Sequence, residues 1–268
     1  MSDGTDRTSP KTSSYGIVAR DADMVVVLRR GPSKHAQLLR WDLSTDRVEA
    51  GQWLVGVVEL GASGVSPRGE LFVYAARKRG VRFTAISRPP FFTPLAYWEE
   101  QLPWTGGGFF PSDRHVVLGV TGEPHDGGLP EVLEVSELWS YFAWQGNGRS
   151  SLTLGEAVLK APEAHHGWTR HERGRSWSKA APRGADRLIR DGTKGRPAVY
   201  RLGSRDLGEL TWADLARDGS LVFGREGRLY RWRREDSEPR EVADLTGHRF
   251  EMVPPTEEAR RWPRSLRG

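Results

Sequence analysis

The chain repeats one short pattern, in which a turn is followed by two apolar runs that a second turn separates. The clearest copy is WADLARDGSLVFGREGRLYRW, at residues 212–232. Asp218-Gly219 forms its first turn and precedes Leu-Val-Phe, and Glu226-Gly227 precedes Leu-Tyr-Arg-Trp. Short apolar runs bounded by glycine-containing turns are typical of β-hairpins. This stretch is therefore predicted to form two antiparallel strands.

Similar stretches recur along most of the chain. They begin near Val18, Gly64 and Trp177, and a weaker copy, GGFFPSDRHVVLGV, begins at Gly107. The first turns of the five copies are spaced by 47, 45, 70 and 35 residues and are anchored by Asp21, Arg68, Asp113, Arg183 and Asp218. The blades of a β-propeller repeat about every 40–50 residues. The spacing of 70 predicts an insertion or a degenerate extra blade between residues 121 and 177.

Helical periodicity is poor and the apolar runs are short, which indicates an all-β fold. We predict a β-propeller-like single domain over residues 15–255, with about five blades of antiparallel strands and irregular structure around residues 121–176. The N-terminal strand around Ile17 is expected to close the ring by pairing with the last blade. Residues 1–14 are expected to be disordered, and residues 256–268 to form a mobile basic tail.

Two of these motifs resemble those of a known class of propellers. The stretch SPRGELFVY, from Ser66, is similar to the "Ser-Pro-Asp-Gly, then a strand" signature of WD-repeat-like propellers of the TolB type. LLRWDL, from Leu38, and LYRW, from Leu229, look like the third strand of the same blades. Arg68 and Arg183 stand where that class usually has Asp, and the Trp-Asp pair is complete only at Trp41-Asp42. The resemblance implies a propeller fold, which hosts enzymes and scaffolds alike.

A second resemblance is to an uncharacterised bacterial protein family of similar length. It is carried by AISRPPFFTPLAYW, from Ala85, and by WTGGGFF, from Trp104. The likeness implies no activity, so it adds nothing to the prediction of function.

Composition bounds the compartment and the chemistry. The 268 residues include no cysteine, which excludes disulfides, thiolate metal sites and a cysteine nucleophile. No secretion signal is recognisable at the N-terminus, and no apolar run approaches the roughly 20 residues of a membrane helix. We therefore expect a cytoplasmic protein. The net charge of +5 arises from interspersed charges, which is typical of a solvated mixed surface.

Residues that could carry catalysis or bind a metal are few. Glu163, His165, His166 and His171 form a candidate metal site, although the stretch EAHHGWTRHERG also suits a solvated polar loop. The chain has no Gly-x-Ser-x-Gly elbow, and glycines 106–108 lack the Gly-Lys-Ser/Thr of a phosphate-binding loop. We therefore predict no catalytic residues and no cofactor.

The most unusual local feature is RPPFFTPLAYW, from Arg88, because its three prolines exclude both a helix and a central strand. Its aromatic residues either pack between blades or form an exposed recognition patch. The candidate partner surface consists of Phe91, Phe92, Tyr97, Trp98 and Trp104.

The repeats without a catalytic motif favour a non-catalytic module that binds a protein partner through one face of the propeller. One alternative is a carbohydrate-active enzyme that uses carboxylates in the central channel. Another is a nucleic-acid-binding protein, since LYRWRRE and EARRWPRSLRG mix arginine with tryptophan.

Overall fold

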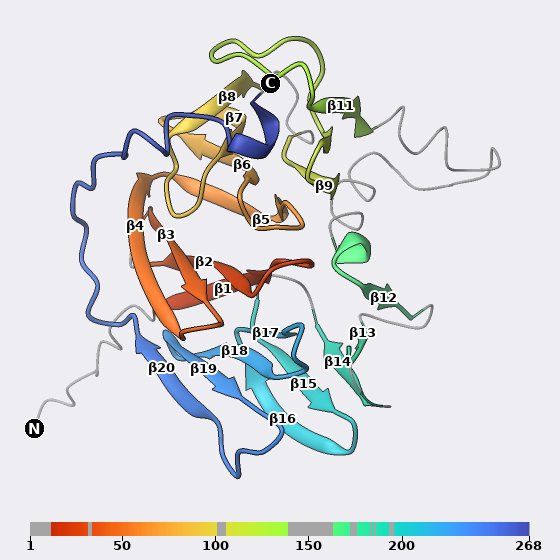
Figure 1. The fold of residues 1–268 in the computed structure, drawn as a ribbon. Coiled ribbons are helices and arrows are strands. Elements are labelled where there is room, and N and C mark those ends of the chain that lie inside the picture. The colour runs from red at the N-terminus through yellow and green to blue at the C-terminus, as the bar shows by residue number, and fades with distance from the viewer. Residues whose placement is uncertain are drawn as a thin grey trace, which may run out of the picture.

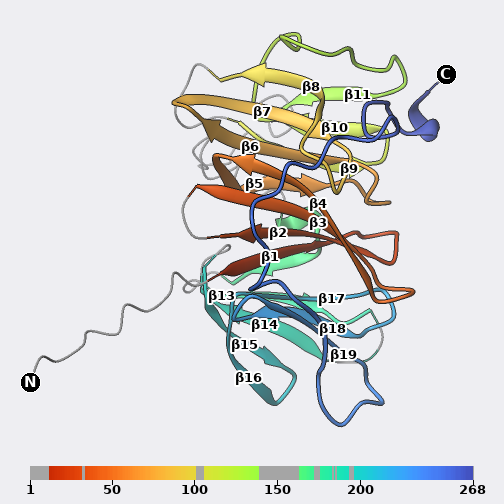
Figure 2. The ribbon, with the colours of Figure 1, turned by 90° about the vertical axis from the view of Figure 1, so that its left-hand side faces the viewer.

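The computed structural model describes residues 12–31, 34–100, 106–138, 163–171, 176–182, 184, 186–192 and 196–267. Strands dominate these residues, and the strands form five open sheets that we number as blades 1 to 5 in chain order. Figure 1 shows the blades arranged in sequence around a common centre, and Figure 2 shows the same ring from the side. The predicted all-β, propeller-like fold of five blades is thereby confirmed.

Blades 1 and 2 are regular four-stranded antiparallel sheets in which neighbouring strands follow one another along the chain. Blade 1 contains β1 (Ser13–Val18), β2 (Met24–Arg30), β3 (His35–Asp42) and β4 (Arg47–Val55). Blade 2 contains β5 (Val57–Val65), β6 (Phe72–Lys78), β7 (Val81–Ser87) and β8 (Pro94–Glu99).

Blade 3 is the irregular one, as the long spacing between repeats predicted. It contains β9 (Gly108–Ser112), β10 (His115–Leu118) and β11 (Glu134–Glu137). β10 pairs with β9 in the antiparallel sense but with β11 in the parallel sense, so the blade departs from the simple meander of blades 1 and 2. Residues 139–162 and 172–175 of the predicted irregular segment lie outside the described residues.

Blades 4 and 5 return to regular antiparallel order. Blade 4 contains β12 (Trp168–Arg170), β13 (Ser176–Ala180), β14 (Arg187–Asp191), β15 (Ala198–Leu202) and β16 (Arg205–Leu210). Blade 5 contains β17 (Trp212–Leu215), β18 (Leu221–Arg225), β19 (Arg228–Trp232) and β20 (Arg240–Asp244). The two strands expected in residues 212–232 correspond to β18 and β19, and their register joins Leu221 to Trp232.

The hydrophobic core is divided among the interfaces between blades. One cluster lies between blades 1 and 2, a second between blades 5 and 1, a third between blades 2 and 3, and a fourth between blades 4 and 5. Blade 1 is therefore buried on both faces: Leu38 belongs to the first cluster and Leu39 to the second. Burial of apolar surface between sheets is thus the main force that holds one blade against the next.

The N-terminal strand does not pair with the last blade, although we expected this pairing from the sequence. β1 pairs with β2 and not with blade 5, so the predicted pairing of the N-terminal strand is wrong. β1 instead packs face to face against β17 and β18. Gly16 makes this close approach possible, because a Cβ at this position would lie 2.4 Å from Cη2 of Trp212.

A long C-terminal strap reinforces the ring from outside. Residues 245–267 leave blade 5, cross blade 1 and reach blades 2 and 3, as the blue trace in Figures 1 and 2 shows. Arg29 holds the start of the strap, since its guanidinium donates to the carbonyls of Leu245 and His248, both at 2.8 Å. Gln52 of β4 holds the middle through the Val253 carbonyl at 3.0 Å.

The end of the strap includes most of the segment that we expected to be a mobile tail. Its described part, residues 256–267, ends in a short 3-10 turn, η1 (Arg264–Leu266), and docks on blades 2 and 3. Leu266 is buried in the cluster between these blades, and the Trp262 indole donates to the Gly128 carbonyl at 2.8 Å. Charge dominates this segment in the sequence, but its few apolar side chains decide where it packs.

Candidate functional site

A groove between the outer parts of blades 1 and 2 includes two of the predicted partner residues, Phe92 and Tyr97. Its volume is about 360 Å³, and Leu54 of β4 forms the wall on the blade 1 side. The blade 2 side contributes Tyr74, Lys78, Arg79, Val81, Phe83, Phe92, Pro94, Tyr97 and Glu99. A concave surface lined by aromatic side chains and a few charged groups is typical of a ligand or peptide site.

Hydrogen bonds fix the position of Phe92 at the base of this groove. The Gln52 side-chain oxygen accepts from the backbone amides of Phe92 and Thr93, both at 2.9 Å. The Tyr74 hydroxyl donates to the Phe92 carbonyl at 2.8 Å, and the two rings meet edge to face at 5.3 Å. Phe92 is therefore held by both blades, and a partner would meet a preformed surface.

Tyr97 forms the other aromatic part of the groove. Its ring packs against Phe83 with centroids 5.2 Å apart, and its hydroxyl lies 3.3 Å from a Glu99 carboxylate oxygen. Desolvation, together with the negative charge of Glu99, raises the pKa of Tyr97. The hydroxyl is therefore protonated at neutral pH, as a hydrogen-bond donor must be.

The rim of the groove carries two basic residues. Lys78 and Arg79 lie at the turn between β6 and β7, and both side chains are exposed. No ion pair joins either residue to a carboxylate among the described residues. Since Glu99 lies on the same surface, the groove offers an apolar centre with a mixed, mainly basic edge.

The structure brings together only part of the candidate partner surface. Phe92 and Tyr97 line the groove, whereas Phe91 is half-buried beside it. Trp98 is 1 % exposed in the cluster between blades 2 and 3, where its indole donates to the Gly122 carbonyl at 3.0 Å. Trp104 lies outside the described residues.

Sequence reasoning missed most of the groove lining. Leu54 and Phe83 come from other strands, and no local pattern links either of them to the proline-rich segment. Val81 was also missed, although its place directly after the Arg79-Gly80 turn is a local signal that could have marked it as exposed. Its exposure of 44 % makes it one of the most exposed large apolar residues of the described chain.

Buried charges gather around blade 4 and the neighbouring strand β17. Glu163 pairs with Arg190 at 2.7 Å, and Asp214 pairs with Lys179 at 2.6 Å. The Arg190 guanidinium also contacts the Trp168 and Trp177 rings, at 5.2 and 5.3 Å from their centroids. Each of the two carboxylates is thus paired with a cation of its own.

The candidate metal ligands point to separate partners. The His165 ring stacks on Phe109 of β9 with centroids 4.3 Å apart, and burial lowers its pKa. The Nε2 atom of His171 lies 2.9 Å from the Ser178 hydroxyl, and Glu163 is engaged by Arg190. Within the described parts of the chain, no three His, Asp or Glu side chains are grouped to hold a metal ion.

Helices are scarce, and within the described ranges none is long and apolar enough to span a bilayer. No protein-family profile matches the sequence, and no curated protein matches it either.

The chain is similar to several solved structures, two of which are propeller domains. The β-propeller domain of Cps50 (Swd1) from Myceliophteria thermophila is 12% identical, with a TM-score of 0.29, and the match covers 85% of this chain and 66% of that one. TolB from Acinetobacter baumannii is 15% identical, with a TM-score of 0.31 and coverage of 82% and 51%. The Dos1 propeller is 11% identical, with a TM-score of 0.29 and coverage of 90% and 56%.

The chain thus spans between about half and two thirds of the length of these three structures. The class of the fold rests on the five sheets themselves and their arrangement around a common centre.

Proposed function

We propose that the chain is a non-catalytic module that binds an extended segment of a protein partner in the groove between blades 1 and 2. The observation that carries this proposal is the preformed aromatic lining, in which Phe92 and Tyr97 face Leu54 of the neighbouring blade. Aromatic anchors that meet in a pocket dominate the energetics of many protein interfaces.

The chemistry of the rim identifies the kind of segment that fits. Lys78 and Arg79 flank the groove without carboxylate partners among the described residues, so a partner with acidic residues gains favourable electrostatics there. The apolar centre requires a large aliphatic or aromatic side chain. The proposed ligand is therefore a peptide segment with one apolar anchor and one or more neighbouring carboxylates.

No described contact favours the two alternative functions in the same way. The carboxylates of the buried charge cluster, Glu163 and Asp214, are each bound to a cation. Several surface arginines are likewise paired with acids, including Arg40 with Glu49 and Arg201 with Asp191. Paired arginines offer less charge to a polyanion than free ones do.

A peptide-display selection on the immobilised full chain tests the proposal. Enriched peptides should share an apolar residue next to Asp or Glu. Val81→Asp should weaken their binding at least tenfold, because it places a carboxylate on the groove wall. Val199→Asp is the matched control, since Val199 is similarly exposed, at 43 %, but lies on blade 4.

Reversal of the rim charge gives an independent check. Lys78→Glu combined with Arg79→Glu should weaken the acidic peptides and leave neutral analogues with the same anchor nearly unaffected. If no peptide is enriched, or if the enriched peptides bind the Val81→Asp protein as well as the unmodified one, the groove is not the binding site.

A further inference from the structure

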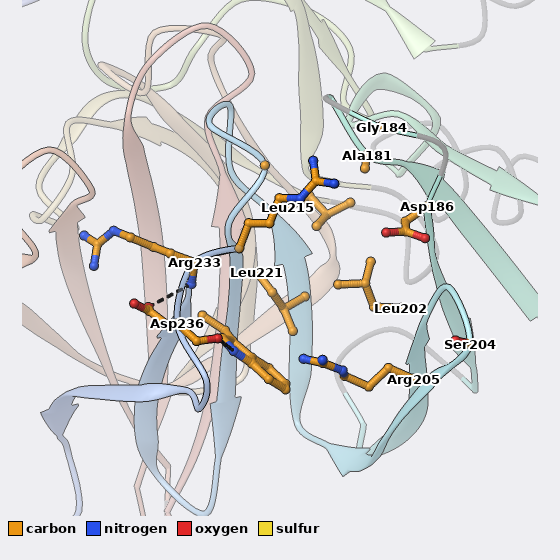
Figure 3. Close-up of a pocket in the computed structure, with 13 residues that line it drawn as sticks. Ala181, Gly184, Asp186, Leu202, Ser204, Arg205, Leu215, Leu221, Arg233 and Asp236 are labelled. Atoms are coloured by element: carbon orange, nitrogen blue, oxygen red, sulfur yellow. Dashed lines mark hydrogen bonds between the residues drawn. The ribbon is translucent and has the colours of Figure 1, made fainter.

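A second cavity lies between blades 4 and 5, away from the aromatic groove. Its volume is about 330 Å³. Figure 3 shows two facing walls: Leu202, Ser204 and Arg205 belong to blade 4, and Leu215 and Leu221 belong to blade 5. The leucines form an apolar patch at the back of a lining that is otherwise mainly polar, and such a patch suits the side chain of a small organic ligand.

Arg205 supplies a positively charged group that is already oriented. Its guanidinium lies over the Trp232 ring, 4.2 Å from the centroid, and Figure 3 shows the side chain extending into the cavity. The Trp232 indole is itself fixed, because it donates to the Asp236 carbonyl at 3.0 Å. No carboxylate among the described residues pairs with Arg205. A stacked guanidinium keeps its N–H edges available for a ligand carboxylate.

Asp186 supplies the opposite charge on the same wall. Figure 3 shows its carboxylate directed into the cavity, with Leu202 between it and Arg205. A glycine at position 203 leaves room for this carboxylate, since a Cβ there would lie 2.6 Å from its Oδ1 atom. Within the described ranges, no hydrogen bond or ion pair engages the carboxylate.

The other charged residues of the lining are either turned away or add to the positive side. Figure 3 shows Arg233 and Asp236 directed away from the cavity. Arg233 binds Asp46 at 2.7 Å, and the Asp236 carboxylate accepts the Arg233 amide at 3.1 Å. Arg234 also lines the cavity and is exposed. A simple anion would therefore meet Asp186, and a simple cation would meet Arg205.

We propose that this cavity binds a small zwitterion with an apolar body, namely a free amino acid with an aliphatic or aromatic side chain. Arg205 takes the carboxylate, Asp186 takes the ammonium group, and Leu202, Leu221 and the Trp232 ring contact the side chain. Two oppositely charged groups on one wall match the two charges of such a ligand, since both charge-assisted contacts can form at once. This inference does not depend on the peptide groove.

Calorimetric titration of the full chain with L-leucine and L-phenylalanine tests the assignment. Leucinamide, which lacks the carboxylate, and N-acetyl-leucine, which lacks the ammonium group, serve as single-charge probes. The amino acids should bind at least tenfold more tightly than either probe. Arg205→Gln and Asp186→Asn should each weaken leucine binding at least tenfold.

The pattern across the probes separates this site from a general charge effect. Asp186→Asn should leave N-acetyl-leucine binding unchanged or stronger, because that probe has no ammonium group to lose a partner. Arg201→Gln and Asp191→Asn are the matched controls, since this exposed pair lies on the same blade outside the cavity. Absence of amino-acid binding, equal binding of N-acetyl-leucine, or insensitivity to both cavity variants would overturn the proposal. Thermal unfolding of each variant verifies that it folds.

Discussion

The Arg231 guanidinium joins two blades that are far apart in the sequence. It extends from β19 of blade 5, where it binds Asp218 at 2.6 Å and the Ser220 hydroxyl at 3.0 Å. It also reaches the turn between β3 and β4 of blade 1, where it donates to the Leu43 carbonyl and to Asp46. Burial works to raise the pKa of Asp46, but hydrogen bonds from Arg231 and Arg233 outweigh it and lower the pKa. Asp46 is therefore a charged acceptor at neutral pH.

Loss of this buried guanidinium should destabilise the protein strongly. Arg231→Ala leaves the nearly buried Asp46 carboxylate without its best partner, so we expect the free energy of unfolding to fall by about 3–5 kcal/mol. Arg240→Ala removes a 55 % exposed partner of the same carboxylate and should cost about 1 kcal/mol or less. Urea denaturation of both variants measures the difference. Equal losses would show that burial does not distinguish the two contacts.

The sequence motif that contains Arg231 predicted the strand, but it did not predict that the arginine side chain is buried. Arg40 occupies the same position in the matching motif of blade 1, yet its side chain is exposed and pairs with Glu49. Arg231 lies on the same face of its strand as Leu229, which packs against blade 1, whereas Arg40 shares a face with Leu38, which packs against blade 2. Alternation gives the two faces of a strand, but only the neighbouring blades determine which face buries a charge.

At the scale of elements, the strap is the feature that ties the blades together. It has almost no regular secondary structure, and side chains of the blades bind its backbone at intervals. Its end is anchored by Leu266, which is 1 % exposed among apolar residues of blades 2 and 3 such as Leu71 and Leu118. An extended segment fixed by a few contacts depends heavily on each buried anchor.

Shortening the buried side chain of Leu266 should therefore destabilise the protein strongly. Leu266→Ala should lower the free energy of unfolding by about 2–5 kcal/mol, as expected for a large buried aliphatic side chain. Met252→Ala, in the same strap but at a residue that is 87 % exposed, should change it by less than about 0.5 kcal/mol. Thermal and urea unfolding measure both. A small effect of Leu266→Ala would mean that the strap end contributes little to the folded state.

At the scale of the whole molecule, the first and last blades approach each other closely at Gly16, in addition to their shared apolar cluster. The Trp212 indole covers Gly16 and donates to the Ser14 hydroxyl at 3.3 Å. Even one added methyl group at Gly16 must displace this ring, so Gly16→Ala should cost about 1–3 kcal/mol. Gly128→Ala is the control, because a Cβ there would meet no atom within 4 Å.

A double-mutant cycle tests whether the cost arises from closure. The smaller ring in Trp212→Phe should relieve part of the clash, so the double variant should lose less stability than the sum of the two single losses. Simple additivity would show that Gly16→Ala acts elsewhere in blade 1.

The sequence allowed the number and order of blades to be predicted, because each blade carries its own turn and apolar runs, such as Asp218-Gly219 before β18. It did not allow closure or the groove to be predicted. The contact between Gly16 and Trp212, and the meeting of Leu54 with Phe92, both depend on how separate sheets pack. Phe92 and Tyr97 were accessible to sequence reasoning only because their segment is unusually rich in proline and aromatic residues.

The strap also has a consequence for folding during translation. The Ser265 hydroxyl, 195 positions further along the chain, donates to Glu70 of blade 2 at 3.1 Å, and Leu266 next to it completes the apolar cluster between blades 2 and 3. A ribosome makes both halves of that cluster long before it makes the residue that covers it. During translation, Leu71 and Leu118 therefore remain without the side chain of Leu266, which is synthesised later and covers them in the folded protein. The newly made blades must remain soluble, or be shielded by a chaperone, until it arrives.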